Sequence, residues 1–158
     1  DKINDHYLQI NSDYIGCVDD TCLATGELLP VKDTPFDFNK RKRIGQDLEA
    51  DHIQLKNAFG YDHSFVLNGT ENQLTLEEPV SGRRLIISTT APVVQVYTGN
   101  FLKDGCIGKA GRVYENREGV ALETQLMPNA INTEENPSTI LRKGDKFESN
   151  TKYVFEIM

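Results

Sequence analysis

Short runs in which apolar and polar residues alternate dominate this chain. The clearest are residues 7–10 and 153–157, where apolar side chains occupy every second position. Strand side chains repeat with a period of two, so this alternation predicts half-buried β-strands. Two further runs are rich in β-branched residues and also favour strands: the apolar run 85–87, and residues 93–97, which have the polar Gln95 in their middle.

Turn signals separate these runs. Apolar runs at 65–67 and 74–76 flank an Asn68-Gly69 dipeptide, and we expect them to be strands that pair as a hairpin with a loop longer than two residues. Asn68-Gly69-Thr70 also matches a glycosylation acceptor. The turn is the preferred interpretation, because Asn-Gly between two apolar runs is first of all a turn signal.

Helical signals are weak. Only residues 44–50 suggest a helix, and they lack a long periodic apolar stripe. The chain shows no internal repeat and no obvious linker, and its 158 residues are enough for one domain with a real core. We therefore predict an all-β chain that forms an antiparallel β-sandwich as a single domain over residues 1–158.

Charge and hydropathy exclude two classes of partner. The net charge of −7 argues against non-specific nucleic-acid binding, which depends on neutralising phosphates. No apolar run approaches the length of a membrane span, and the polar residues 1–5 do not resemble a secretory signal, so we expect a cytoplasmic protein. A basic run at 39–43 is interpreted as a solvated loop rather than a phosphate site, because no glycine-rich cradle accompanies it.

The three cysteines give no metal-binding pattern. Cys17, Cys22 and Cys106 fit no familiar zinc spacing, so we expect no metal site. A disulfide between Cys17 and Cys22 is possible from their separation alone. Reduced cysteines are favoured for a cytoplasmic protein.

The stretch 119–132 carries the most informative polar residues. Glu123 and Gln125 lie two residues apart on an expected strand that ends at Pro128-Asn129, so both side chains point to one face. A carboxylate at the end of a rigid strand, beside a neutral hydrogen-bonding group, suits a general base that meets a polyol. The alternative is a solvent-facing pair on a half-exposed strand.

Five segments, in order along the chain, resemble the aldose 1-epimerases (galactose mutarotases). They are His6-Tyr7-Leu8-Gln9-Ile10 with Thr25-Gly26-Glu27, Thr34-Pro35-Phe36-Asp37-Phe38, Gly60-Tyr61-Asp62-His63, Gln95-Val96-Tyr97-Thr98-Gly99-Asn100-Phe101-Leu102, and Leu122-Glu123-Thr124-Gln125 with Pro128-Asn129-Ala130-Ile131-Asn132. The resemblance covers nearly the whole chain and about the C-terminal half of the family. It implies a β-sandwich of the galactose mutarotase type, of which this chain is the C-terminal portion.

The resemblance also implies an activity and a set of site residues. Such enzymes interconvert the α and β anomers of free hexoses such as galactose and glucose, without a cofactor. By resemblance, Glu123 is the catalytic base, and Asp62 and Gln95 bind the sugar. His63 and Gln125 are possible supporting residues. From the residues alone, Asp62 could instead cap a turn, and Gln95 could face solvent.

Neighbouring residues receive simpler interpretations. We expect His63 to fill a satisfied, partly buried position rather than tune Asp62. Tyr97 is expected in the core rather than against a sugar, and Asn100 is expected to serve the turn that follows Gly99.

The acid of this family is a histidine in a segment that this sequence does not contain. His6 matches a later segment of the family, and His52 matches nothing in it. We therefore expect an upstream N-terminal half, in the same gene product or as a separate chain, to be the partner that supplies the acid. Two alternatives stay open: an epimerase of the same superfamily that acts on a hexose phosphate, and a sugar-binding module without catalysis.

Overall fold

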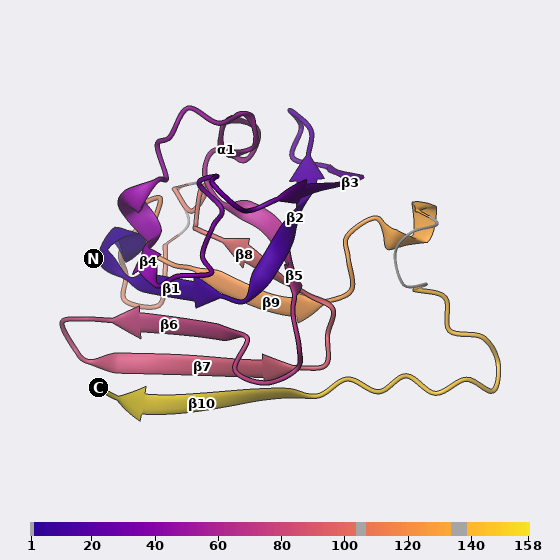
Figure 1. Ribbon diagram of the computed structural model, residues 1–158. Coiled ribbons are helices and arrows are strands. Elements are labelled where there is room, and N and C mark those ends of the chain that lie inside the picture. Colours follow the sequence, from indigo (N-terminus) through magenta and orange to yellow (C-terminus); the bar gives the residue numbers. More distant parts are fainter. Residues whose placement is uncertain (1, 104–106, 134–138) are drawn as a thin grey trace.

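A computed structural model of the chain, which describes residues 2–103, 107–133 and 139–158, contains two five-stranded antiparallel sheets. Sheet A has the strand order β10-β7-β6-β1-β4, and sheet B has the order β3-β2-β5-β8-β9. In Figure 1, β6, β7 and β10 lie below β5, β8 and β9. The structure is nearly all β, and the predicted fold class is confirmed.

The strands of sheet A are β1 (Tyr7–Ile10), β4 (Lys42–Arg43), β6 (Leu74–Glu78), β7 (Arg83–Thr89) and β10 (Thr151–Ile157). Those of sheet B are β2 (Ser12–Val18), β3 (Ala24–Pro30), β5 (Asp62–Leu67), β8 (Val93–Tyr97) and β9 (Ala121–Gln125). The helical elements are short: α1 (Ile53–Ala58), η1 (Ile3–Asp5), η2 (Ile44–Gln46) and η3 (Ala130–Asn132). Strands were thus correctly predicted at 7–10, 85–87, 93–97 and 153–157.

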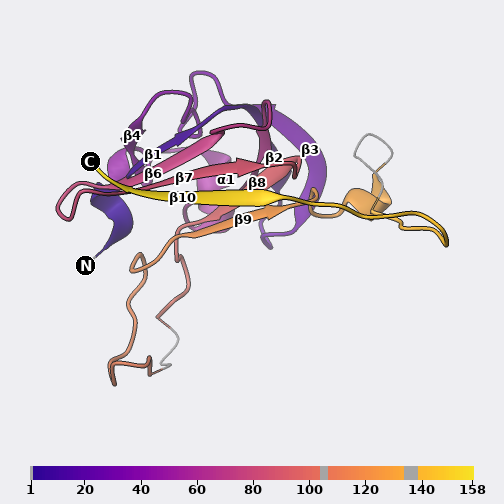
Figure 2. The same cartoon turned by 90° about the horizontal axis from the view of Figure 1, so that it is seen from below.

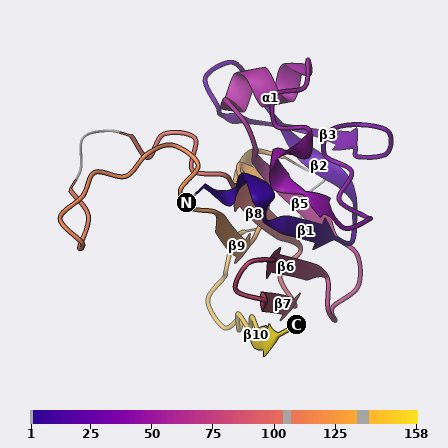
Figure 3. The ribbon, with the colours of Figure 1, turned by 90° about the vertical axis from the view of Figure 1, so that its left-hand side faces the viewer.

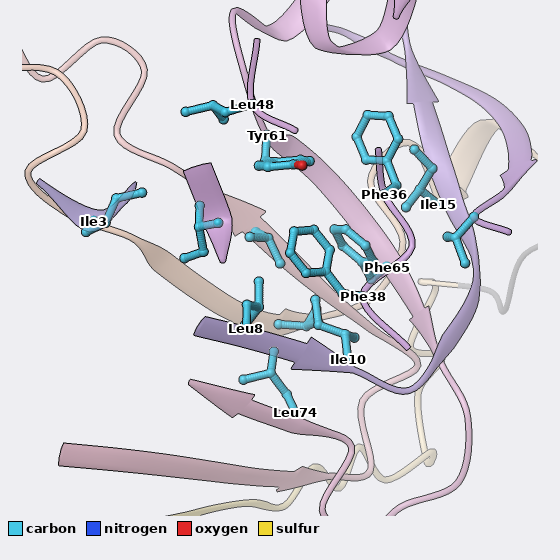
Figure 4. Close-up of a cluster of buried hydrophobic side chains, with 14 of the residues drawn as sticks. Ile3, Leu8, Ile10, Ile15, Phe36, Phe38, Leu48, Tyr61, Phe65 and Leu74 are labelled. Atoms are coloured by element: carbon cyan, nitrogen blue, oxygen red, sulfur yellow. The ribbon is translucent and has the colours of Figure 1, made fainter. Parts of the chain in front are cut away.

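A cluster of aromatic rings fills the space between the sheets. Phe36, Phe38, Tyr61 and Phe65 are each at most 1% exposed and lie together among aliphatic side chains from both layers (Figure 4). Their rings meet edge to face, with centroids 5.5 Å apart for Phe36 and Tyr61 and 5.3 Å for Phe38 and Tyr61. This is the arrangement that aromatic quadrupoles favour. Burial of these rings therefore ties the inner face of β5 to the segment that follows β3.

The expected hairpin between residues 65–67 and 74–76 is wrong. Both runs are strands, but β5 pairs with β2 and β8 in sheet B, whereas β6 pairs with β1 and β7 in sheet A. Phe65 and Leu74 both point into the core from opposite layers, so the chain crosses between the sheets at Asn68-Gly69 instead of folding back. Gly69 has φ of +72°, which is consistent with a turn there.

The helix prediction also needs correction. Residues 44–50 form only the three-residue η2, and α1 begins later, at Ile53. The side chain of His52 caps α1 by accepting a hydrogen bond from the Gln54 backbone N–H at 3.2 Å. Phe59 ends the helix in the left-handed conformation, with φ of 56°. Six residues are too few to show a periodic stripe, which is why the pattern did not reveal α1.

Three of the cations in the basic run 39–43 form ion pairs. Residues 42–43 form β4 instead of a loop, and the cations Arg41, Lys42 and Arg43 pair with Glu77, Asp47 and Asp5, respectively. The expectation that this run is not a phosphate site is consistent with these contacts.

Cys17 and Cys22 are free thiols, and Cys106 lies outside the described residues. No helix among the described residues is long and apolar enough to cross a membrane.

One part of the inner face of sheet A lies open. Phe155 pairs with Leu85 and continues the row of core-facing side chains, yet Phe155 and Ile157 are 77% and 76% exposed. β10 is the edge strand of sheet A and β9 is the edge strand of sheet B. Seen from below, the two strands run in nearly the same direction (Figure 2). The Thr124 and Thr151 hydroxyl oxygens are 3.0 Å apart. The two sheets therefore present their free edges on the same side of the molecule.

We predict that Phe36→Ala lowers the free energy of unfolding by about 3–5 kcal/mol, because it leaves a cavity in the aromatic cluster. Phe147→Ala is the matched control: Phe147 is 63% exposed, and its loss should change stability by no more than about 0.5 kcal/mol. Urea unfolding followed by circular dichroism measures both. Equal losses for the two variants would contradict the assignment of Phe36 to the core.

Candidate functional site

The outward-facing residues of β5, β8 and β9 form a compact grid. Antiparallel pairing places Ser64 opposite Gln95 and Gln95 opposite Glu123, so the three side chains form one row across the sheet. Asp62 lies two residues before Ser64 on β5, opposite Tyr97. Because neighbouring strands are about 4.8 Å apart, a row of three spans roughly the length of a monosaccharide ring with its hydroxyls.

Successive side chains of a strand point to opposite faces of the sheet, so the buried residues of β5 and β8 show which of their residues face outward. His63 and Phe65 on β5 and Val94 and Val96 on β8 are each at most 1% exposed and point between the sheets. The intervening residues must then point to the opposite face. The same rule puts Glu123 and Gln125 on one face of β9, and both line one groove, as the sequence predicted.

The polar row is joined by hydrogen bonds. The Ser64 hydroxyl donates to Gln95 Oε1 at 2.5 Å, and Gln95 Nε2 donates to Asp62 Oδ1 at 2.7 Å. An amide oxygen only accepts and an amide nitrogen only donates, so the two contacts agree on one orientation of the carboxamide. Asp62, Ser64 and Gln95 thus act as one connected unit.

Burial sets the electrostatics of Asp62. Partial removal from water raises the pKa of the Asp62 carboxyl above its usual range, and the hydrogen bond from Gln95 partly counteracts this. The Asp62 backbone N–H donates to His63 Nδ1 at 3.1 Å, so the side chain of His63 braces the start of β5.

His63 itself is fully buried, and the centroid of its ring lies 4.7 Å from that of Phe36. Burial, together with a smaller effect of His52, lowers the pKa of His63 to about 3, so the imidazole is neutral at ordinary pH. His63 is thus buried, more fully than expected, but the expectation of a satisfied position is wrong for Nε2, which has no hydrogen-bond partner among the described residues.

The grid is the floor of an open groove of about 450 Å³, which continues into a narrower pocket of about 90 Å³ toward β2. Asp62, Gln95 and Pro128 line both parts. The wider part is also lined by Tyr97, Phe101, Glu123 and Gln125, and the narrower part by Gly16, Val18, Cys22, Ala24, Ser64 and Met127. All three predicted site residues, Asp62, Gln95 and Glu123, therefore meet in one place.

Tyr97 forms one wall of the groove instead of lying in the core, so its expected position is wrong. Its hydroxyl accepts a hydrogen bond from the Phe101 backbone N–H at 2.9 Å, which holds the ring at the groove. Phe101 is half exposed, and its ring meets that of Phe59 edge to face at 5.3 Å. The connection from β8 to β9 continues from here and extends away from the sheets in residues 107–116 (Figure 3).

Asn100 has a structural role behind this wall, in keeping with the expected turn. It is 3% exposed, accepts a hydrogen bond from the Thr98 hydroxyl at 2.8 Å and donates to the carbonyl of Ala58. Asn100 therefore anchors the turn after β8 to the end of α1 and does not face the groove.

Glu123 lines the groove from β9. Its side chain is exposed, and no hydrogen bond or ion pair joins that carboxylate to any residue within the described ranges. Its oxygens are therefore open to a molecule in the groove.

The described groove lining contains no histidine, lysine or arginine. His52 caps α1, and His6 ends η1. No group of three or more His, Cys, Asp or Glu side chains suited to a metal ion occurs among residues 2–103, 107–133 and 139–158.

Sequence reasoning missed several groove residues. Ser64 lies two residues after Asp62, so the strand period alone could have placed it on the same face. Cys22 and Met127 lie outside the strands and reach the groove through loop geometry, for which a single sequence carries no signal. Burial and the nearby Asp62 carboxylate raise the pKa of the Cys22 thiol, and that thiol donates to the Asn57 carbonyl at 3.0 Å.

Comparison with known proteins assigns the family. The family model described as aldose 1-epimerase matches residues 1–154. This chain belongs to the aldose 1-epimerase family. The galactose mutarotase of Homo sapiens is 39% identical over 159 residues, which cover 99% of this chain and 45% of the human protein. The aldose 1-epimerase of Haemophilus influenzae is 34% identical over 98% of this chain and 46% of its own length.

Solved structures agree with this family assignment. An aldose epimerase homologue from C. elegans superposes with a TM-score of 0.88 and 30% identity, over 99% of this chain and 47% of that protein. A galactose 1-epimerase from Lactobacillus acidophilus gives a TM-score of 0.75 and 31% identity, over 99% and 45% of the respective chains. This member of the family thus spans slightly less than half the length of these relatives.

The link between Gln95 and Asp62 makes a testable prediction. Gln95→Ala removes the hydrogen bond that favours the ionised carboxylate, so the pKa of Asp62, already raised by burial, should rise further. Gln125→Ala is the matched control, because Gln125 lines the same groove without bonding to Asp62. Carbon-13 NMR titration of the aspartate carboxyls measures the pKa. A downward shift in Gln95→Ala would contradict the assigned role of the Gln95 hydrogen bond, because it would mean that better access of water to Asp62 outweighs the loss of that bond.

Proposed function

We propose that the native protein that carries this chain is an aldose 1-epimerase that interconverts the α and β anomers of a free hexose such as galactose or glucose. The observation that carries the proposal is the meeting, in one open groove, of the Glu123 carboxylate, which has no partner among the described residues, with the hydrogen-bonded group of Asp62, Ser64 and Gln95. The family membership gives the reaction class.

Anomer exchange needs two proton transfers on different sides of the reacting centre. A base removes the proton of the C1 hydroxyl while an acid protonates the ring oxygen, which opens the ring. Rotation about the C1–C2 bond and closure then give the other anomer. Each proton transfer assisted by a positioned side chain typically accelerates a reaction by about 10²–10⁴-fold.

Glu123 is the proposed base. Its carboxylate is exposed to the groove, and no donor from the described part of the chain occupies its oxygens, so they can accept the C1 proton. Asp62 on β5 and Gln95 on β8 offer an acceptor and an N–H donor to hydroxyls that do not react. Gln125 lies one strand period from Glu123 and is proposed to support the sugar.

The acid is proposed to come from outside this chain. No histidine of the described residues reaches the groove, and the matched relatives are about twice as long as this chain. The free edges of β9 and β10 and the exposed face around Phe155 and Ile157 offer a surface for further strands next to Glu123. We propose that an N-terminal half docks there and places its acid opposite the base.

A neutral sugar suits the groove better than a sugar phosphate. The two charged groups in the described lining, Asp62 and Glu123, are both carboxylates, which would repel a phosphate. Three cations of the 39–43 run, Arg41, Lys42 and Arg43, are paired with acidic residues elsewhere on the structure. A binding module without catalysis is also less well supported, since it would not need an open carboxylate at the position of Glu123.

We predict that Glu123→Gln in the native protein lowers the mutarotation rate at least about a hundredfold, because the amide keeps the shape of the side chain but cannot accept the proton as a base. Glu71→Gln is the matched control, because Glu71 is exposed near the far end of sheet A and should leave the rate unchanged. Polarimetry of freshly dissolved α-galactose and α-glucose measures the rate. More than about a tenth of the wild-type rate in Glu123→Gln would rule out Glu123 as the base.

A second prediction concerns the 158 residues alone. Without the proposed acid, the isolated polypeptide should not accelerate anomer exchange above the spontaneous rate. It should also self-associate, because Phe155 and Ile157 are exposed beside two unpaired strand edges.

Light scattering reports the association, and polarimetry reports the activity. The N-terminal half of the native protein, added as a separate polypeptide, should restore activity and reduce self-association. Full activity of a monomeric 158-residue chain would refute the proposal that the acid is supplied from outside it.

A further inference from the structure

The carboxamide of Gln95 has a carboxylate within reach on each side. Glu123 lies directly opposite on β9, and Asp62 lies diagonally across on β5. Side chains at directly opposite antiparallel positions have Cβ atoms about 4.5–5.5 Å apart, so a glutamine can bond to a glutamate there. Nevertheless, the amide donates to Asp62 at 2.7 Å, and no bond joins it to Glu123.

Ser64 accounts for this choice. It lies on the β5 side of Gln95, is 4% exposed, and its hydroxyl donates to Gln95 Oε1 at 2.5 Å. With Oε1 held toward β5, the amide nitrogen also stays on that side and meets Asp62. The alternative orientation of the amide would bring Oε1 against the Asp62 carboxylate, placing two acceptors together.

We propose that Ser64 is a positioning residue: its hydroxyl holds the Gln95 carboxamide on the β5 side, so that the amide serves Asp62 and leaves the Glu123 carboxylate free. The catalytic consequence rests on the proposed function. The hydrogen bond from Ser64 to Gln95, called the tether below, does not depend on that function. An amide that swung toward β9 would occupy a Glu123 oxygen that must accept the C1 proton. It would also deprive Asp62 of its donor.

The hydrogen bond from Ser64 to Gln95 also favours hydroxyl groups over anionic groups at this end of the groove. The oriented pair of Gln95 and Asp62 presents a donor beside an acceptor, which matches a hydroxyl, a group that both accepts and donates. A carboxylate or phosphate oxygen at that position would lack a proton for Asp62. Ser64 therefore helps to restrict this end of the groove to neutral hydroxyl-bearing substrates.

The kinetic test uses the native protein with Ser64→Ala. We expect kcat/KM for anomer exchange to fall about five- to tenfold, the usual effect of losing one buried hydrogen bond. Ser64→Thr, which keeps the hydroxyl, should restore most of the activity. Ser12→Ala is the matched control: Ser12 is also buried, at 1% exposure, but its hydroxyl donates to the Tyr14 carbonyl on β2, so kcat/KM should stay unchanged.

A double-mutant cycle separates positioning from a general loss of structure. If Ser64 acts through Gln95, Ser64→Ala should have no further effect on kcat/KM in a Gln95→Ala background. An undiminished effect in that background, or an unchanged kcat/KM in the single variant, would overturn the inference.

A measurement that needs no activity tests the tether directly. In ¹⁵N-labelled native protein, the side-chain NH₂ signals of Gln95 are identified by their absence in Gln95→Ala. Ser64→Ala should shift these signals and accelerate their exchange with water several-fold, whereas Ser12→Ala should not. An inactive wild-type protein would refute the proposed function while these signals still decide the tether, and unchanged signals in Ser64→Ala would refute the tether.

Discussion

Burial of the inner face of β5 is the constraint on which the site depends. Phe65 packs into the aromatic cluster with Phe36 and Phe38, and His63 packs against Phe36 on the same face. A shift of one residue along β5 would move these rings into solvent and send Asp62 and Ser64 into the core. The stability of the core and the placement of the polar row are therefore one requirement, imposed through the two-residue period of the strand.

Much of the fold could be predicted from local pattern. Strands such as β1, β8 and β10 alternate or are rich in β-branched residues, and the all-β class follows from them. The pairing of strands could not be predicted in the same way. The turn signal at Asn68-Gly69 does not indicate whether the strand after the turn joins the same sheet as the strand before it or the opposite sheet. That residues 1–158 form a single domain stays a prediction.

Site residues on strands could be predicted from the two-residue period of a strand. Site residues positioned by loops and turns could not. Glu123 and Gln125 share a face because they are two residues apart, and the resemblance to the family singled out Asp62 and Gln95. Tyr97 was misjudged because an apolar strand does not reveal which of its faces is covered. Its hydroxyl finds a partner in the Phe101 backbone, a contact created by the turn after β8.

The edge position of β9 has a consequence for the order in which the 158-residue chain, on its own, loses its properties. Within the described residues, β9 is hydrogen-bonded to β8 and to no second strand, whereas β5 and β8 each lie between two neighbours. Local opening of a sheet begins at such edges and requires less free energy than global unfolding. Fraying of β9 would carry Glu123 away while Asp62, Ser64 and Gln95 stay in place, so the site would retain its hydroxyl-binding half after losing its base.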